Sequence, residues 1–258
     1  MRRNRLKEII RQGGVVIDAW LTIPSSFAAE AMAHQGFDAV TIDTQHGLIG
    51  FETAVAMLQA ISTTDAVPMA RVAANDPAAI MQLLDAGAYG IICPMISSAD
   101  EARAFAAACR YPPRGVRSFG PSRGQFYGGA DYAERADDEI IALAMIETTG
   151  GIENVDAILA VPEIDGIFIG PNDLSLALGR RPASESNDPL VSDTIRGIAA
   201  RARAAGKIAA IFCSGGEGAA RRICEGFNFV VPGGDLGHLL RSAEASVATA
   251  RAAAKDRV

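Results

Sequence analysis

Two acidic residues follow apolar runs whose length and composition are typical of buried strands. Glu147 ends the run IIALAMIE, and Asp173 comes directly after GIFIGPN. If these runs are neighbouring parallel strands, both carboxylates reach one edge of the sheet and can bind Mg²⁺ or Mn²⁺ together with waters and a substrate oxygen. Two other interpretations use the same residues: each acid can cap the helix that follows it, or the pair can act as acid and base, as in a glycosidase.

A histidine and an arginine stand at the ends of two further runs. His46 comes three residues after Asp43, which ends AVTID, and Arg71 ends PMAR. An imidazole at a strand end can accept or donate a proton near pH 7, although a loop histidine bonded to the backbone is the alternative. A buried guanidinium must be paired, and its planar fork suits a carboxylate or enolate oxygen. The structural alternative for Arg71 is an ion pair with Asp76 or Asp85, and Asp85 could instead pair with His46.

Eight short apolar runs alternate with longer Ala-rich segments of helical periodicity. The runs are nearly continuously apolar, which is typical of parallel strands covered on both faces. The expected strands are 15–19, 39–43, 68–72, 90–94, 141–147, 166–170, 207–211 and 229–231, and the expected helices are 27–34, 51–63, 77–85, 99–109, 152–159, 189–204, 218–224 and 236–254. We therefore predict an α/β fold of one domain over 1–258, a (β/α)8 TIM barrel. An open doubly wound sheet is the alternative, but no GxGxxG follows the first strand.

Positions around the expected strand ends limit the chemistry. A Schiff-base aldolase needs a lysine in the barrel interior. The only lysines are Lys7 and Lys255, near the chain ends, and Lys207, which starts a strand and so lies at the wrong end of the barrel. A carbanion formed here would therefore need a metal ion. The segment Gly170-Pro171-Asn172 opens a helix, and its free amides favour an anionic group such as a substrate carboxylate. The irregular stretch 111–130 resembles a functional loop after the fourth strand.

The composition excludes several classes of partner. The net charge is −6, so there is no basic surface for nucleic acid or an anionic membrane. No uncharged apolar run approaches the roughly 18 residues of a membrane helix, and the N-terminus does not resemble a signal peptide. The four cysteines form no CxxC pair and indicate reduced core thiols. We expect a cytoplasmic protein that acts on a small molecule.

Several motifs together resemble the HpcH/HpaI aldolase family, the metal-dependent pyruvate aldolases of the phosphoenolpyruvate/pyruvate-binding barrels. The resemblance covers nearly the whole chain. The motifs are GFDAVTIDTQHG (36–47), ARV (70–72), LLDAGAYGIICPMISSADEA (83–102), YPPRGVRSFGP (111–121), AMIET (144–148) and GIFIGPNDLS (166–175).

The resemblance implies a barrel whose last helix is exchanged between subunits, usually in a homo-hexamer. It implies a divalent cation, Mg²⁺, Mn²⁺ or Co²⁺, held by Glu147 and Asp173, which pyruvate chelates. By the same resemblance, Arg71 stabilises the pyruvate enolate and His46 is the acid/base group. The remaining implied site residues are Asp85, which orients His46, then Gly170, Pro171 and Asn172 around the substrate carboxylate, and finally Trp20 and Asp43 at the mouth.

The implied activity is cleavage of 4-hydroxy-2-oxo acids to pyruvate and an aldehyde. The sequence differs from well-known members in RSFGP (117–121), in Gly47 after the histidine and in Thr148-Thr149. These differences surround the aldehyde side and leave the acceptor open. The alternatives are an oxaloacetate decarboxylase or macrophomate synthase-like lyase, a citryl- or malyl-CoA lyase-like enzyme, and a non-catalytic oxo-acid binding protein.

Overall fold

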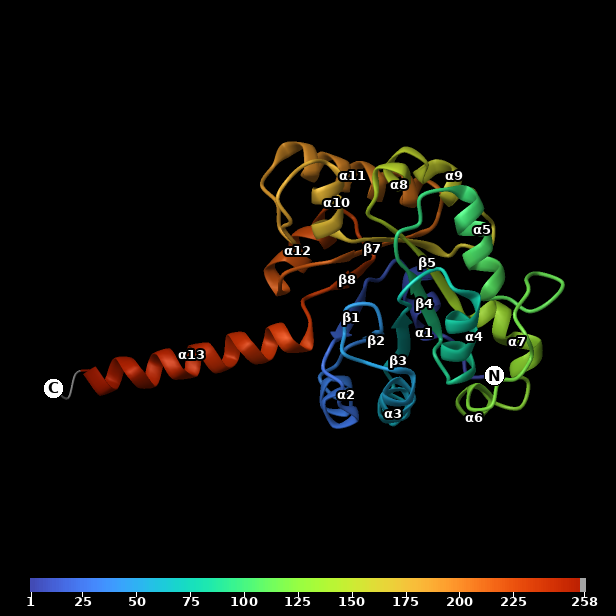
Figure 1. Ribbon diagram of the computed structural model, residues 1–258, viewed down its shortest axis with the longest axis horizontal. Coiled ribbons are helices and arrows are strands. Elements are labelled where there is room, and N and C mark those ends of the chain that lie inside the picture. The colour runs from blue at the N-terminus through green and yellow to red at the C-terminus, as the bar shows by residue number, and fades with distance from the viewer. Residues whose placement is uncertain (256–258) are drawn as a thin grey trace.

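A computed structural model describes residues 1–255 of the chain. Eight parallel strands pair in sequence order, and β1 pairs with β8, so the sheet closes into a barrel surrounded by helices (Figure 1). The strands are β1 Val16–Leu21, β2 Ala39–Asp43, β3 Val67–Arg71, β4 Gly90–Cys93, β5 Ile141–Ile146, β6 Gly166–Ile169, β7 Ile208–Phe212 and β8 Phe229–Val231. The predicted (β/α)8 barrel is confirmed, and each strand lies within two residues of its expected bounds.

The strands form a barrel because their side chains are apolar on both faces. Nearly every strand residue is buried, the outward ones under helices and the inward ones inside the barrel. Asp18 is an acidic residue among these apolar side chains. Its carboxylate is fully buried inside the barrel and accepts a hydrogen bond from Thr41 Oγ1 at 2.7 Å. Burial raises the pKa of Asp18 to about 8. It lies two residues before Trp20 on the same face of β1, so it sits one layer deeper than the strand ends.

The helices of the described residues are α1 Arg5–Arg11, α2 Ser26–Ala33, α3 Phe51–Ile61, α4 Pro77–Asp85, α5 Ala99–Ala108, α6 Gly124–Gly128, α7 Tyr132–Glu139, α8 Thr149–Glu153, α9 Val155–Leu159, α10 Pro171–Ala177, α11 Pro189–Ala204, α12 Gly216–Cys224 and α13 Asp235–Lys255. Three were not expected, namely α1, α6 and α7. They are short and carry few buried residues, so apolar periodicity gives little signal. The helix expected over 152–159 is two helices that meet at Asn154.

The expected position of 111–130, directly after the fourth strand, is wrong. The stretch follows helix α5 rather than strand β4, so it leads to the N-terminal end of the barrel. Its arginines stabilise that end. Arg117 pairs with Asp85 at 2.7 Å, and Arg123 donates to the carbonyl of Ala86 at 2.7 Å.

The last helix, α13, leaves the barrel and projects away from it (Figure 1). Only its first residues touch the barrel, and residues 239–254 are exposed. In the part of the chain that is described, no helix combines the length and apolar character that a membrane span requires. All four cysteines are free thiols; Cys93, Cys109 and Cys213 are buried as expected, whereas Cys224 is exposed and is not a core residue.

Candidate active site

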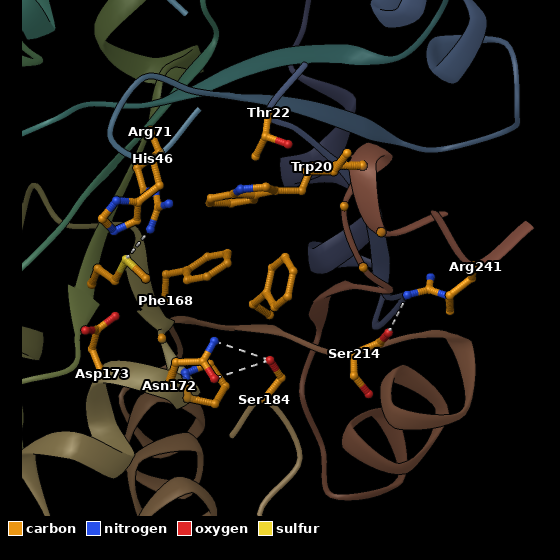
Figure 2. Close-up of a pocket in the computed structure, with 18 residues that line it drawn as sticks. Trp20, Thr22, His46, Arg71, Phe168, Asn172, Asp173, Ser184, Ser214 and Arg241 are labelled. Carbon is orange, nitrogen blue, oxygen red and sulfur yellow. Dashed lines mark hydrogen bonds between the residues drawn. The ribbon is translucent and has the colours of Figure 1, made fainter. Parts of the chain in front are cut away.

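A cavity of about 440 Å³ opens at the C-terminal ends of the strands. Three aromatic side chains form its wall: the Trp20 ring lies 5.5 Å from Phe168 and 5.8 Å from Phe212 between centroids. The predicted site residues that line it are Trp20, His46, Arg71, Gly170, Pro171, Asn172 and Asp173 (Figure 2). The cavity is therefore where parallel barrels place their chemistry.

Asp43 holds Arg71 in a two-point ion pair. Arg71 Nε donates to one carboxylate oxygen at 2.8 Å and Nη2 to the other at 2.5 Å. Both residues are nearly inaccessible, with side-chain exposures of 8% and 1%. Burial alone would favour the neutral acid, but the Arg71 guanidinium keeps the pKa of Asp43 below its ordinary value. The structural alternative of a pair with Asp76 or Asp85 is wrong, because the partner of Arg71 is the strand-end acid of the neighbouring strand.

This pairing leaves one edge of the guanidinium for the cavity. Arg71 Nη1 does not contact Asp43 and instead lies 3.9 Å from the Met145 sulfur, which lines the cavity (Figure 2). The guanidinium also stacks against Trp20, 4.8 Å from the ring centroid. Arg71 is thus fixed on one side and presents a donor on the other.

Asp43 also fixes the groups beside Arg71. Its carboxylate accepts from Trp20 Nε1 at 3.2 Å and from the backbone N–H of His46 at 3.2 Å. The tight turn that results explains Gly47, because a Cβ there would lie 2.2 Å from the carbonyl oxygen of Asp43. The His46 side chain is exposed to the cavity on the same side as Arg71 (Figure 2).

Glu147 and Asp173 approach each other from β5 and α10. Glu147 is 4% exposed and accepts a hydrogen bond from the Met95 N–H at 3.0 Å. Burial, and secondly the negative charge of Asp173, raises the pKa of Glu147 to about 7. Gly170 makes this arrangement possible, because a Cβ there would lie 2.3 Å from Glu147 Oε2.

The surroundings of this acid pair fit a divalent cation. Within residues 1–255, no group of three or more His, Cys, Asp or Glu side chains could form a complete metal cage. Two carboxylates with room for water and substrate oxygens match the way in which Mg²⁺ and Mn²⁺ are usually bound. A helix-capping role does not account for Glu147, because the Thr148 hydroxyl caps α8 by accepting from the Gly151 N–H at 2.9 Å. A cation would also remove the repulsion between the two acids.

The turn between β6 and α10 offers backbone donors. Gly170 is the N-cap residue of α10, and no side chain caps this helix. Pro171 has no N–H, so the free donors of the first turn begin at Asn172. Asn172 and Asp173, which begin this turn, line the cavity together with Arg71.

Asp85 is not brought to this site within one chain. It ends helix α4, five residues before β4 begins, and therefore lies at the N-terminal end of the barrel, whereas His46 follows the C-terminal end of β2. Its hydrogen-bond partner is Arg117 Nη2 at 2.7 Å. Burial raises the pKa of Asp85 despite this pairing.

Sequence reasoning missed several cavity residues. Phe168 and Phe212 lie within apolar runs and carried no signal of their own, while Ser184 and Ser214 lie in connections after β6 and β7. Arg241 also lines the cavity, from the second turn of α13. No sequence signal singled it out, because α13 also carries the charged residues Glu244 and Arg251.

Comparison with known proteins relates the chain to one family. Residues 18–242 match the model of the family described as HpcH/HpaI aldolase/citrate lyase. A hydroxypyruvate/pyruvate aldolase of Rhizorhabdus wittichii is 44% identical over 96% of this chain and 99% of that protein. A 4-hydroxy-2-oxo-heptane-1,7-dioate aldolase of Salmonella dublin is 39% identical over 95% of this chain and 94% of that protein.

Solved structures resemble the whole chain as well. An HpcH/HpaI aldolase/citrate lyase family protein from Burkholderia cenocepacia superimposes with a TM-score of 0.88 at 29% identity, covering 96% of this chain and 99% of that one. Macrophomate synthase superimposes with a TM-score of 0.87 at 26% identity, covering 99% of this chain and 91% of that one.

Proposed function

The chain belongs to the HpcH/HpaI aldolase/citrate lyase family and is a carbon–carbon lyase, and we propose that it cleaves 4-hydroxy-2-oxo acids to pyruvate and an aldehyde with a divalent cation. The observation that carries this proposal is the grouping of three functions around one cavity. A fixed guanidinium, an exposed imidazole and a pair of carboxylates all reach the strand ends.

We propose that Glu147 and Asp173 are the protein ligands of the cation. When bound, Mg²⁺, Mn²⁺ or Co²⁺ supplies positive charge that stabilises the negative charge developing on the substrate oxygens. The oxygen donor set, the mutual repulsion of the two acids and the space left by Gly170 support this assignment.

The substrate carboxylate and 2-oxo group bind between Arg71 and the first turn of α10. Arg71 Nη1, which Asp43 leaves free, donates to the 2-oxo oxygen. The N–H groups that begin at Asn172 face the carboxylate beside Gly170 and Pro171. Trp20 and Asp43 keep this geometry fixed, because Trp20 donates to Asp43 and stacks on Arg71, while Asp43 accepts from both.

His46 moves the proton. It accepts the proton of the C4 hydroxyl, directly or through a water, as the C3–C4 bond breaks and the C4 oxygen becomes the aldehyde carbonyl. The bonding electrons remain on the three-carbon fragment as the pyruvate enolate, whose oxygen Arg71 stabilises. Protonation at C3 then gives pyruvate. An orienting role for Asp85 would require the Asp85 of a neighbouring subunit, since Asp85 and His46 lie at opposite ends of one barrel.

The direct test is pyruvate release from a panel of 4-hydroxy-2-oxo acids with Mg²⁺, Mn²⁺ or Co²⁺, and after chelation. We expect release that depends on the cation and falls by at least about 100-fold in Glu147→Gln, because a neutral amide is a poor ligand for a hard cation. The control is Glu153→Gln, at the end of helix α8 and outside the cavity. Full activity after chelation would contradict the proposal.

Oxaloacetate decarboxylation separates the role of His46 from that of the other groups. Decarboxylation gives the same enolate without removing a hydroxyl proton, so it needs Arg71 but no base at C4. We expect His46→Ala to slow retro-aldol cleavage by about 10²–10⁴-fold and decarboxylation far less. Equal losses in both reactions would mean that His46 only shapes the cavity.

The proposal also covers the cellular compartment and the oligomeric state of the enzyme. The free thiols Cys93, Cys109 and Cys213 support a reducing compartment such as the cytoplasm. We also propose a homo-oligomer, as in the hexamers that the family resemblance implies, because α13 leaves the barrel with its apolar residues exposed.

A further inference from the structure

The cavity has a second polar end that the cleavage chemistry does not use. Ser184, Ser214 and Arg241 lie there, across the aromatic wall from His46, Arg71 and Asp173 (Figure 2). The two ends come from different parts of the chain. The first end is built by β2, β3 and α10, and the second by the connections after β6 and β7 together with the start of α13.

Arg241 has no acidic partner in this position. Its Nη1 lies 3.4 Å from the carbonyl oxygen of Ser214, and its Nη2 lies 3.0 Å from His238 Nδ1. Within residues 1–255, no carboxylate lies within ion-pairing distance of its guanidinium. Glu185, which contacts the Ser214 N–H at 3.4 Å, is already paired with Arg221 and Arg222. The positive charge at this end of the cavity is therefore uncompensated.

Two glycines leave room for the Arg241 guanidinium. A Cβ at Gly237 would lie 3.2 Å from Arg241 Nη1, and a Cβ at Gly233 would lie 3.4 Å from Nη2. Gly233 also has a φ of +98°, which a side chain would strain. Both glycines line the cavity. The backbone thus leaves open the space between Arg241 and the cavity.

The space between the two ends is apolar. Trp20, Phe168 and Phe212 form the wall along which a substrate chain would run. Such a wall suits a short carbon chain, while the Arg241 guanidinium suits a carboxylate or phosphate at the end of that chain. The Ser184 hydroxyl, which exchanges hydrogen bonds with Asn172, links this end to the pyruvate end.

We propose that Arg241 selects substrates whose aldehyde-derived part ends in an anionic group. The inference rests on the proposed function. A substrate with a second acidic group beyond C4 already appears in the name of the Salmonella dublin relative, a 1,7-dioate aldolase, and the inference adds the residue that would recognise that group. Arg241 is then a specificity residue: it contacts the part of the substrate that leaves as the aldehyde and takes no part in the bond cleavage.

The test compares three substrates that share the reacting atoms. They are 4-hydroxy-2-oxoheptanedioate with a carboxylate tail, a 6-phospho-4-hydroxy-2-oxohexanoate with a phosphate tail, and 4-hydroxy-2-oxoheptanoate with an uncharged tail. We expect Arg241→Met to lower kcat/KM roughly tenfold for an anionic tail and less than about twofold for the uncharged one, because Arg241 is partly solvent-exposed. Arg241→Lys should recover part of the loss. The substrate whose kcat/KM falls in Arg241→Met shows whether the site prefers a carboxylate or a phosphate.

Arg251→Met is the matched control, since Arg251 lies exposed on the same helix and outside the cavity. It should behave as wild type with all three substrates. An equal loss for Arg241→Met on charged and uncharged tails, or no loss on any tail, would overturn the inference.

A binding measurement separates this inference from the proposed reaction. Trp20 is the only tryptophan of the chain and lines the same cavity, so its fluorescence reports ligand binding without turnover. Glutarate should bind roughly tenfold more weakly to Arg241→Met than to wild type. If no substrate yields pyruvate but glutarate binding still depends on Arg241, the proposed reaction fails while the anion site stands. Glutarate binding that is unchanged in Arg241→Met would contradict the anion site itself.

Discussion

At the scale of single residues, Asp43 organises the site although it performs no chemistry. One carboxylate receives both arms of the Arg71 fork, the Trp20 indole and the backbone of His46. The family resemblance implied that Asp43 lines the mouth, whereas the structure buries it behind Arg71 and Trp20. The sequence did not reveal this pairing, because the partners lie 23 to 28 residues apart and only the register of β1, β2 and β3 aligns them.

Arg71→Lys should abolish most of the activity while the barrel still folds. A lysine cannot bond to both oxygens of Asp43 and also present a donor to the enolate oxygen, so we expect kcat to fall by about 100-fold. Exchange of the pyruvate methyl protons with solvent deuterium, followed by NMR, measures enolate formation directly and should fall in parallel. Arg103→Lys, exposed on α5, is the control. Wild-type exchange in Arg71→Lys would refute the enolate role.

The raised pKa of Glu147 makes cation binding dependent on pH. Burial and then the charge of Asp173 raise it to about 7, so below that value a proton competes with the cation for the carboxylate. The Mg²⁺ concentration for half-maximal activity should rise about tenfold per pH unit below pH 7 and level off above pH 8.

The raised pKa of Glu147 also determines how the stability of the metal-free protein changes with pH. The native metal-free protein holds this proton more tightly than the unfolded chain, so its stability falls as the pH rises from about 4.3 to about 7. The increase in Tm on adding Mg²⁺ should therefore grow across that interval. A gain in Tm that is constant between pH 5.5 and 8.5 would contradict the assignment of Glu147 as a ligand.

At the scale of elements, the sequence was informative where polar residues interrupt apolar runs. Asp43 ends β2, Glu147 directly follows β5, and Asp173 comes four residues after β6, so predicting the strands also located these three acids, of which Asp173 lines the cavity. It failed where elements are charged and short, as with α7, and where location depends on which end of the barrel a helix reaches. Asp85 illustrates the second case: the family resemblance implied a role beside His46, but Asp85 ends helix α4 and therefore lies at the opposite end of its own barrel.

The junction of β6 and α10 depends on Gly170. In Gly170→Ala the new Cβ would meet Glu147 Oε2 at 2.3 Å and the Met145 methyl group at 2.6 Å. Both are ends of flexible side chains that can move, so we expect a modest loss of stability but at least about a tenfold loss of pyruvate release, because Glu147 leaves its position. Pyruvate-release assays and urea unfolding measure the two effects separately.

Gly197→Ala is the matched control for this substitution. Gly197 lies inside helix α11, where an added Cβ would meet nothing within 4 Å. Alanine there should stabilise the protein by about 0.5–1 kcal/mol and leave activity unchanged. If the two alanine variants lost activity equally, the effect would not come from the contact between Gly170 and Glu147.

At the scale of the whole molecule, one chain is not compact. Its accessible surface is 11666 Å², against about 10,800 Å² for a typical folded monomer of 26.9 kDa. The excess agrees with α13, which extends from the barrel (Figure 1). Leu239 is 58% exposed, Leu240 59% and Val247 53%, which is unusual for apolar residues on one face of a helix. The helix does not fold back to bury this face on its own barrel.

We therefore predict that α13 packs on a second copy of this chain. The exposed face also includes Ala243 and Ala250, which recur at helical spacing and need a partner surface. Light scattering at micromolar concentration should give a mass well above 26.9 kDa, and a hexamer would contain six such chains. The double variant Leu239→Glu/Leu240→Glu should shift the mass toward the monomer, because it places charges within an apolar contact.

Ala245→Glu is the control, because it adds a charge on the opposite side of the same helix and should leave the mass unchanged. A wild-type mass of one chain would exclude the association, and equal masses for the double variant and Ala245→Glu would show that this face of α13 does not form it.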